Sequence, residues 1–200
     1  IIMILRNPVD RAYSLYNWMV QDGYEWASFA TALKLESKRS KTIRNTFFAP
    51  AYPLNYQYRA SGLYYDQVKR YLDIFPRNQI LAIEYSHFKD QPQECYDRVC
   101  NFLGVSSQKV PDQRINPSVS ILSPKLQFVI RKMNNVRVHL QKNKASSKHR
   151  RDWPLEIFQR ARAPKPLSPQ QREELSHYFK EDIKKLEKLL NWDLSSWLTS

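Results

Sequence analysis

A cationic side chain and a hydroxyl lie close together near the start of the sequence. Arg6 ends a continuous apolar run over residues 1–5, and Ser14 follows eight residues later. The planar guanidinium of Arg6 can donate a fork of hydrogen bonds to a phosphate, and the Ser14 hydroxyl can add a neutral one. This pair predicts a site for a phosphate monoester. The alternative is that Arg6 merely ends a strand and that Ser14 is a solvated helix residue.

The segments around Arg6 favour the phosphate interpretation. The apolar run is typical of a strand that is buried on both faces. Asn7 is a good helix N-cap and Pro8 a preferred first helical residue, and helical periodicity continues to about residue 22. The sequence therefore places Arg6 at the carboxyl end of a strand, facing a helix N-terminus whose partial positive charge favours anions.

Further helices and one further strand follow this first unit. Apolar residues recur at helical spacing over residues 27–37, 61–75, 92–103, 123–140 and 168–190, and residues 79–85 read as a second buried strand. Strands that alternate with helices predict an α/β fold, a parallel sheet flanked by helices, within a single domain over residues 1–200. In the last helix, the Glu and Lys residues read as a solvated face.

The composition indicates an anionic partner. Lys and Arg number 32 against 19 Asp and Glu, which gives a net charge of +13. Nucleic acid, a membrane surface, an anionic cofactor or an acidic polymer would each fit this balance. A hydrophobic content of 42% argues against disorder. No apolar stretch approaches the ~20 residues that a membrane-spanning helix needs.

The two cysteines read as structural thiols. Cys95 and Cys100 lie five residues apart in a helical pattern, so they occupy different faces and an intrahelical disulfide is not expected. The sequence has no cluster with the spacing of metal ligands. Buried free thiols fit a reducing compartment, and we expect a cytoplasmic location.

Several segments together resemble a known family. Residues 2–14, Ile-Met-Ile-Leu-Arg-Asn-Pro-Val-Asp-Arg-Ala-Tyr-Ser, resemble the 3′-phosphate-binding strand–helix motif of sulfotransferases that use 3′-phosphoadenosine 5′-phosphosulfate (PAPS). Residues 63–105 are similar to the family in the order and spacing of their segments, and residues 167–197 resemble its terminal helix with the closing Asp-Leu-Ser-x-Trp. The resemblance is greatest to bacterial members and to domains that sulfate glycans.

The resemblance implies roles for particular residues. Arg6 and Ser14 would hold the 3′-phosphate of the cofactor, and Tyr85 matches a position beside the adenine. Asn116 and Ser118 match a polar pair that lines the cofactor cleft. The alternatives are that Tyr85 is a core aromatic at a strand end and that Asn116 and Ser118 cap a turn.

A later basic segment lies where the family has a Lys/Arg-Gly phosphate-binding loop. Lys148, Arg150 and Arg151 occupy this part of the chain, but the glycine of the family pattern is missing. We count Arg150 and Arg151 among the expected cofactor contacts.

Two parts of the family pattern are missing from the sequence. The Gly-rich loop whose Lys reaches the 5′-phosphosulfate, and the His or Glu that acts as general base, belong before residue 1, and a chain with only 3 Gly offers no substitute. We therefore expect a P-loop-like sulfotransferase fold that is N-terminally truncated and lacks the first strand–loop–helix. The catalytic residue stays unassigned, and we expect the chain alone to be inactive.

The resemblance implies sulfuryl transfer from PAPS to a hydroxyl or amine acceptor, such as a glycan or a small alcohol. The product would be 3′,5′-adenosine bisphosphate, and neither a metal nor nucleic acid is expected. One alternative is a non-catalytic module that binds an anion, a nucleic acid or a glycan through basic residues 131–165. The other is a P-loop enzyme of the nucleotide kinase type, which would need a Gly-Lys-Ser/Thr loop.

Overall fold

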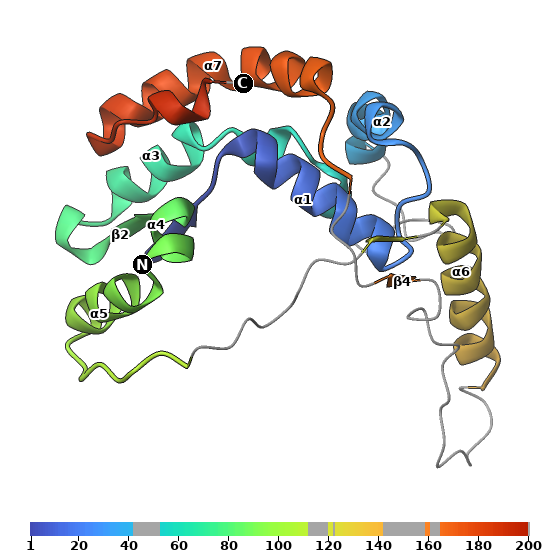
Figure 1. Ribbon diagram of the computed structural model, residues 1–200, viewed down its shortest axis with the longest axis horizontal. Helices are drawn as coiled ribbons and strands as arrows, with labels where there is room; N and C mark the ends of the chain where they lie inside the picture. Colours follow the sequence, from blue (N-terminus) through green and yellow to red (C-terminus); the bar gives the residue numbers. More distant parts are fainter. Residues whose placement is uncertain (42–52, 112–119, 122, 142–158, 161–164, 200) are drawn as a thin grey trace. The chain divides into compact units, whose positions relative to one another are not determined.

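The computed structural model (Figure 1) describes residues 1–41, 53–111, 120–121, 123–141, 159–160 and 165–199. The chain forms two compact units. Unit 1 comprises Ile1–Arg11, Gly62–Ile115 and Pro169–Ser200, and unit 2 comprises Ala12–Ser61 and Asn116–Ser168. Helix α1 (Pro8–Gln21) begins in unit 1 and continues into unit 2.

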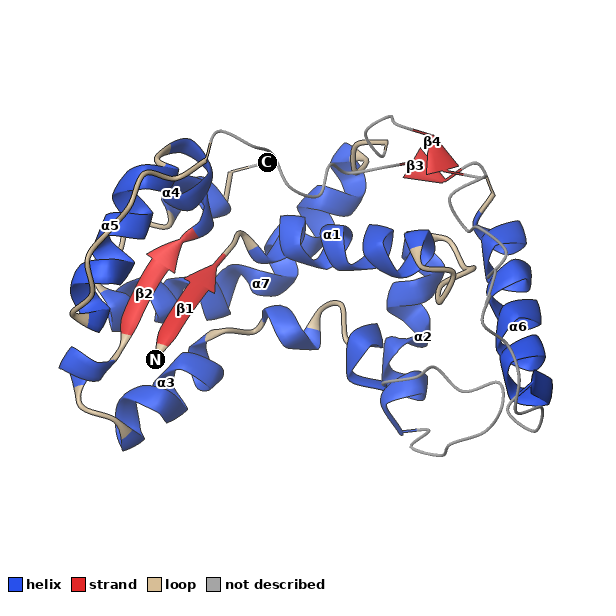
Figure 2. Cartoon of the chain, turned by 90° about the horizontal axis from the view of Figure 1, so that it is seen from below, coloured by secondary structure: helices blue, strands red, loops and turns tan. Residues whose placement is uncertain are grey.

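A two-stranded parallel sheet forms in unit 1. Strand β1 (Ile2–Leu5) pairs with β2 (Leu81–Glu84), and the register places Ile2 opposite Leu81 and Leu5 opposite Glu84. The two strands lie side by side and point in the same direction (Figure 2). The parallel sheet predicted from the alternation of strands and helices is therefore confirmed.

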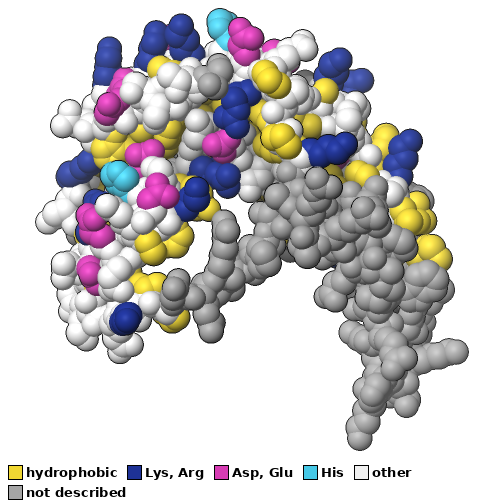
Figure 3. Space-filling model, in the orientation of Figure 1, with side chains coloured by type: hydrophobic (Ala, Val, Ile, Leu, Met, Phe, Trp, Pro, Cys, Tyr) yellow, Lys and Arg dark blue, Asp and Glu magenta, His cyan; other side chains and the backbone are white. Residues whose placement is uncertain are grey.

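Helices pack around this sheet within unit 1. Helix α3 (Tyr65–Ile74) contacts α7 (Pro169–Leu190), while α4 (Tyr85–Asp90) and α5 (Pro92–Leu103) contact β2. The apolar stripe of α7 forms much of the core, and its buried members are Leu175, Phe179, Ile183, Leu186 and Leu190. Lys and Arg side chains stand on the outer surface over α7, interleaved with acidic ones (Figure 3). The predicted solvated face is confirmed.

The strands are not buried on both faces, and that prediction was wrong. Ile2 is 39% exposed and Ile4 is 49% exposed, whereas Leu5 and Ile83 are buried. Side chains alternate across a strand, so one face of β1 packs inward and the other carries Ile2 and Ile4. No described helix covers that second face (Figure 2).

Two element boundaries also differ from the prediction. Tyr85 is the first residue of α4 rather than the end of a strand, because β2 stops at Glu84, where its partner β1 stops. The helix expected over residues 61–75 is divided into a 3-10 turn, Ala60–Gly62, and α3. Cys95 and Cys100 are free and buried in α5, as predicted.

Unit 2 contains mostly helices in its described part. Helix α2 (Phe29–Lys41), the 3-10 turn Pro53–Tyr56 and α6 (Pro124–Gln141) accompany the second part of α1. Two short antiparallel strands, β3 (Ser120–Ile121) and β4 (Gln159–Arg160), also belong to this unit.

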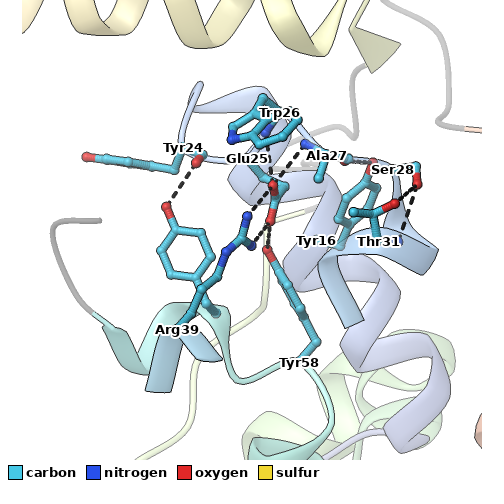
Figure 4. A network of polar contacts seen from close by, with 10 residues as sticks. Tyr16, Tyr24, Glu25, Trp26, Ala27, Ser28, Thr31, Arg39 and Tyr58 are labelled. Carbon is cyan, nitrogen blue, oxygen red and sulfur yellow. Dashed lines mark hydrogen bonds and ion pairs between the residues drawn. The ribbon is translucent and has the colours of Figure 1, made fainter. Parts of the chain in front are cut away.

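A buried carboxylate organises unit 2. Glu25 has no exposed surface and accepts hydrogen bonds from the backbone N–H groups of Trp26 and Ala27, both at 3.0 Å. The Tyr58 hydroxyl donates to the same carboxylate at 2.9 Å, and Arg39 forms a two-pronged ion pair with it (Figure 4). The carboxylate therefore joins the loop after α1 to α2 and to residue 58.

Candidate functional site

The ends of the two parallel strands bring two of the predicted cofactor residues together. Leu5 pairs with Glu84, so the residues that follow them, Arg6 and Tyr85, leave the sheet at the same edge. The Arg6 guanidinium carbon lies 4.9 Å from the centre of the Tyr85 ring. This is a cation–π contact between two partly buried side chains.

The helix start beside Arg6 forms as the sequence predicts. The Asn7 side-chain oxygen accepts the Val9 backbone N–H at 2.9 Å, which is the contact of an N-cap. Pro8 is the first residue of α1, where its missing N–H costs nothing. The guanidinium of Arg6, the capped N-terminus of α1 and the ring of Tyr85 therefore occur together at the carboxyl ends of the two strands in unit 1.

A tyrosine that the sequence interpretation gave no role contacts the backbone of Arg6. The Tyr64 hydroxyl donates to the Arg6 carbonyl oxygen at 3.0 Å. Burial raises the pKa of Tyr64 to about 12, so the hydroxyl keeps its proton at neutral pH and remains a donor. The two residues are 58 positions apart, and no spacing rule connects them.

The closing tryptophan contacts the same edge of the sheet. Trp197 is 3% exposed, and its indole N–H donates to the Glu84 carboxylate at 2.9 Å. The Trp197 carbonyl accepts the Asn7 side-chain amide at 3.4 Å. Its ring meets the Tyr64 ring edge to face, with centres 6.3 Å apart. The resemblance included this tryptophan only as part of a terminal motif.

The remaining predicted residues stay predictions. Ser14 is exposed on α1 and belongs to unit 2. Asn116, Ser118, Arg150 and Arg151 lie outside the described residues.

The described part of the chain shows neither a cluster of metal ligands nor a membrane-spanning helix. Within the described ranges, no group of three or more His, Cys, Asp or Glu side chains is arranged to hold a metal ion. None of the helices in the described part of the chain combines the length and apolar character needed to cross a bilayer.

An aspartate of α7, 118 positions further along the sequence, caps the N-terminus of α3. Asp182 accepts the backbone N–H of Tyr64 at 2.7 Å and that of Tyr65 at 3.2 Å. Burial raises the pKa of Asp182 above its usual 3.8, although these two hydrogen bonds oppose the shift. The carboxylate therefore fixes the position of Tyr64 while remaining costly to ionise.

Replacing Asp182 with Asn is expected to remove part of the pH dependence of stability. The folded chain holds the Asp182 proton more tightly than the unfolded chain, so the stability contributed by this group falls as the pH rises from 3.8 through the raised pKa. Urea unfolding at several pH values measures this effect. As the pH rises over that range, the unfolding free energy of the parent should fall relative to that of Asp182→Asn. The exposed Asp73→Asn on α3 is the control, and a pH-independent difference at residue 182 would contradict the prediction.

Comparison with known proteins agrees with the sequence resemblance. Residues 1–187 match the sulfotransferase domain family. The chain is 31% identical over 113 residues to bifunctional heparan sulfate N-deacetylase/N-sulfotransferase 1 from Mus musculus, a match that covers 54% of this chain and 12% of that protein. The protein of the same name from Homo sapiens is 28% identical over 113 residues, with the same shares covered.

A solved structure is similar along nearly the whole chain. The crystal structure of a sulfotransferase from Alicyclobacillus acidocaldarius superposes with a TM-score of 0.66 at 31% identity, covering 99% of this chain and 57% of that one. The chain thus spans only part of the length of these relatives. The family match over residues 1–187 and the shared fold lead to one conclusion: this chain belongs to the sulfotransferase family.

Proposed function

We propose that the protein transfers a sulfuryl group from PAPS to a hydroxyl or amine acceptor, and that Arg6 binds the 3′-phosphate of this cofactor. The observation that supports the proposal is the position of Arg6 over Tyr85, 4.9 Å from ring centre to guanidinium carbon, beside the N-terminus of α1. In open α/β sheets, ligands bind outside the carboxyl ends of the strands, which is where both residues lie.

The residues at the strand ends suit such a cofactor. Among the described residues, no carboxylate forms an ion pair with Arg6, so its charge is available to an external anion. The guanidinium fork matches phosphate oxygens, and the helix N-terminus adds partial positive charge. The Tyr85 ring offers an aromatic surface for a purine.

In this proposal, the chain contributes binding and orientation. When bound, PAPS supplies the activated sulfuryl group, and negative charge develops on the phosphate side as that group leaves. Arg6 would hold the nucleotide by a phosphate remote from the reacting atoms, and such remote binding energy fixes the geometry of the reacting centre.

The acceptor, the domain organisation and the location extend the proposal. Two relatives are named as heparan sulfate N-sulfotransferases, which favours a glycan acceptor and, within it, an amine.

The family match runs across both compact units, which supports one sulfotransferase domain built from them. The free, buried thiols of Cys95 and Cys100 support a reducing compartment such as the cytoplasm.

Thermal unfolding with nucleotides tests the cofactor assignment. At a 3′,5′-adenosine bisphosphate concentration of about 100 times its Kd, we expect the Tm to rise by roughly 5–10 °C, since a ligand that binds only the folded chain stabilises it by mass action. ATP with magnesium should give no comparable rise.

Other results would favour the alternatives. A rise in Tm with magnesium and ATP but not with the bisphosphate would support the kinase-type alternative. A rise with a sulfated oligosaccharide alone would support a non-catalytic glycan-binding module. Either result would refute the assignment of Arg6 to a 3′-phosphate.

A further inference from the structure

We infer that Tyr64 and Trp197 are positioning residues, which hold the two strand ends so that Arg6 and Tyr85 face a common ligand. The inference rests on the proposed phosphate role of Arg6. It concerns two side chains that bind backbone or carboxylate atoms at the strand ends. Neither is expected to touch the ligand.

Tyr64 is itself held in place at both ends. Its backbone N–H donates to the Asp182 carboxylate at 2.7 Å, and the residue is only 7% exposed. Its hydroxyl reaches the Arg6 carbonyl at 3.0 Å. The Tyr64 hydroxyl therefore has little freedom to move, and its hydrogen bond restrains the Arg6 backbone.

The turn before Tyr64 is tightly packed. A Cβ atom added at Gly62 would lie 3.0 Å from the Phe179 ring and 3.3 Å from the Pro8 Cβ. The backbone at Gly62 therefore runs in close contact with α7 on one side and the first residue of α1 on the other. This packing fixes the segment that carries Tyr64 relative to the helix start that follows Arg6.

Trp197 restrains the second strand and the helix cap together. Its indole N–H binds Glu84, the last residue of β2 and the neighbour of Tyr85. Its carbonyl accepts the side-chain amide of Asn7, the N-cap of α1. Because Tyr64 and Trp197 also touch each other ring to ring, the two restraints form one cluster.

The cluster has a specific consequence for ligand binding. The Arg6 carbonyl lies where the chain leaves the sheet and enters the helix, and Tyr64 supplies a hydrogen bond there. Without this bond, the strand-to-helix turn would sample more conformations, and binding would have to order it. A preorganised guanidinium binds more tightly than one that must first be positioned.

Two substitutions remove the donors while keeping aromatic packing. Tyr64→Phe deletes one hydroxyl, and Trp197→Phe deletes the indole N–H. For each variant we expect 3′,5′-adenosine bisphosphate to bind roughly three- to tenfold more weakly by calorimetry, the range for one lost hydrogen bond. Binding of 5′-AMP, which lacks the 3′-phosphate, should be unchanged in Tyr64→Phe, whereas Trp197→Phe, which also releases the strand end that carries Tyr85, should weaken 5′-AMP as well.

A variant of α3, the helix that follows Tyr64, separates a positioning role from a general effect on stability. Val68 is buried in α3 and contacts no ligand in the proposal, so Val68→Ala should lower the Tm by opening a cavity. Measured at a temperature where all chains are folded, its affinity for both nucleotides should equal that of the parent. In an Arg6→Ala background, Tyr64→Phe should have no further effect on the bisphosphate.

The results distinguish this inference from the proposed function. If Arg6→Ala weakens bisphosphate binding but Tyr64→Phe and Trp197→Phe do not, the positioning role is wrong and the proposed function stands. Equal weakening of both nucleotides by Tyr64→Phe would indicate a structural role and also overturn the inference. If Arg6→Ala leaves the affinity unchanged, or the parent chain does not bind the bisphosphate, the proposed function fails and the inference fails with it. Should one Phe variant not fold, the other carries the test.

Discussion

Glu25→Ala is expected to lower the free energy of unfolding by about 3–5 kcal/mol, the range found when one partner of a buried ion pair is removed. The substitution leaves the Arg39 guanidinium without its carboxylate partner. It also removes the acceptor of the Tyr58 hydroxyl and of the Trp26 and Ala27 N–H groups. Each of these donors would then have to find water or remain unpaired inside unit 2.

Denaturant unfolding with two comparisons tests this effect. Glu173 is exposed on α7, so Glu173→Ala should change the unfolding free energy by less than about 0.5 kcal/mol. A double-mutant cycle with Arg39→Ala should give a large coupling energy, because the two side chains form one pair. In Glu25→Ala, Arg39 would keep its cation–π contact with the Tyr56 ring, whose centre lies 4.8 Å from the guanidinium carbon. A cost at Glu25 no greater than that at Glu173 would show that the carboxylate does not hold unit 2 together.

The second large effect concerns ligand binding. Arg6→Ala is expected to weaken 3′,5′-adenosine bisphosphate binding by roughly 10- to 100-fold, because hydrogen bonds to charged groups contribute about 1.5–3 kcal/mol. The loss should be confined to nucleotides with a 3′-phosphate, so 5′-AMP should bind the variant and the parent alike. Calorimetric titration of both nucleotides measures the difference directly.

Two matched variants define the cause of that loss. Arg6→Lys keeps the positive charge but not the planar fork, so its affinity should fall between those of the parent and Arg6→Ala. Arg77 is exposed in a 3-10 turn of the same unit, and Arg77→Ala removes an equal charge elsewhere. If Arg77→Ala weakened binding as much as Arg6→Ala, the effect would come from net charge and the phosphate contact would be refuted.

The strand–helix junction at Arg6 could be predicted because its signals are local. An apolar run predicts a strand, and Asn7 followed by Pro8 predicts a helix start, whatever the rest of the chain does. The stripe of α7 could be predicted for the same reason, since its period is set within one helix. The meeting of Arg6 with Tyr85 follows from parallel pairing, which places consecutive strand ends on one edge.

The features that the sequence did not predict depend on distant contacts. The hydroxyl of Tyr64 and the indole of Trp197 bind atoms 58 and 113 residues away, and no periodicity marks such partners. The exposure of Ile2 and Ile4 could not be predicted either, because a continuous apolar run does not indicate which face of the strand is covered. Glu25 would be placed on the surface by its type alone, and only the convergence of its donors explains its burial.

The contact between Trp197 and the N-cap of α1 has a consequence for synthesis. The two residues are 190 positions apart, and the bond to Glu84 spans 113. On the ribosome, the nascent chain would expose β1 and β2 long before this tryptophan emerges. The edge that carries Arg6 can therefore take its final form only after residue 197 has been synthesised and has left the ribosome.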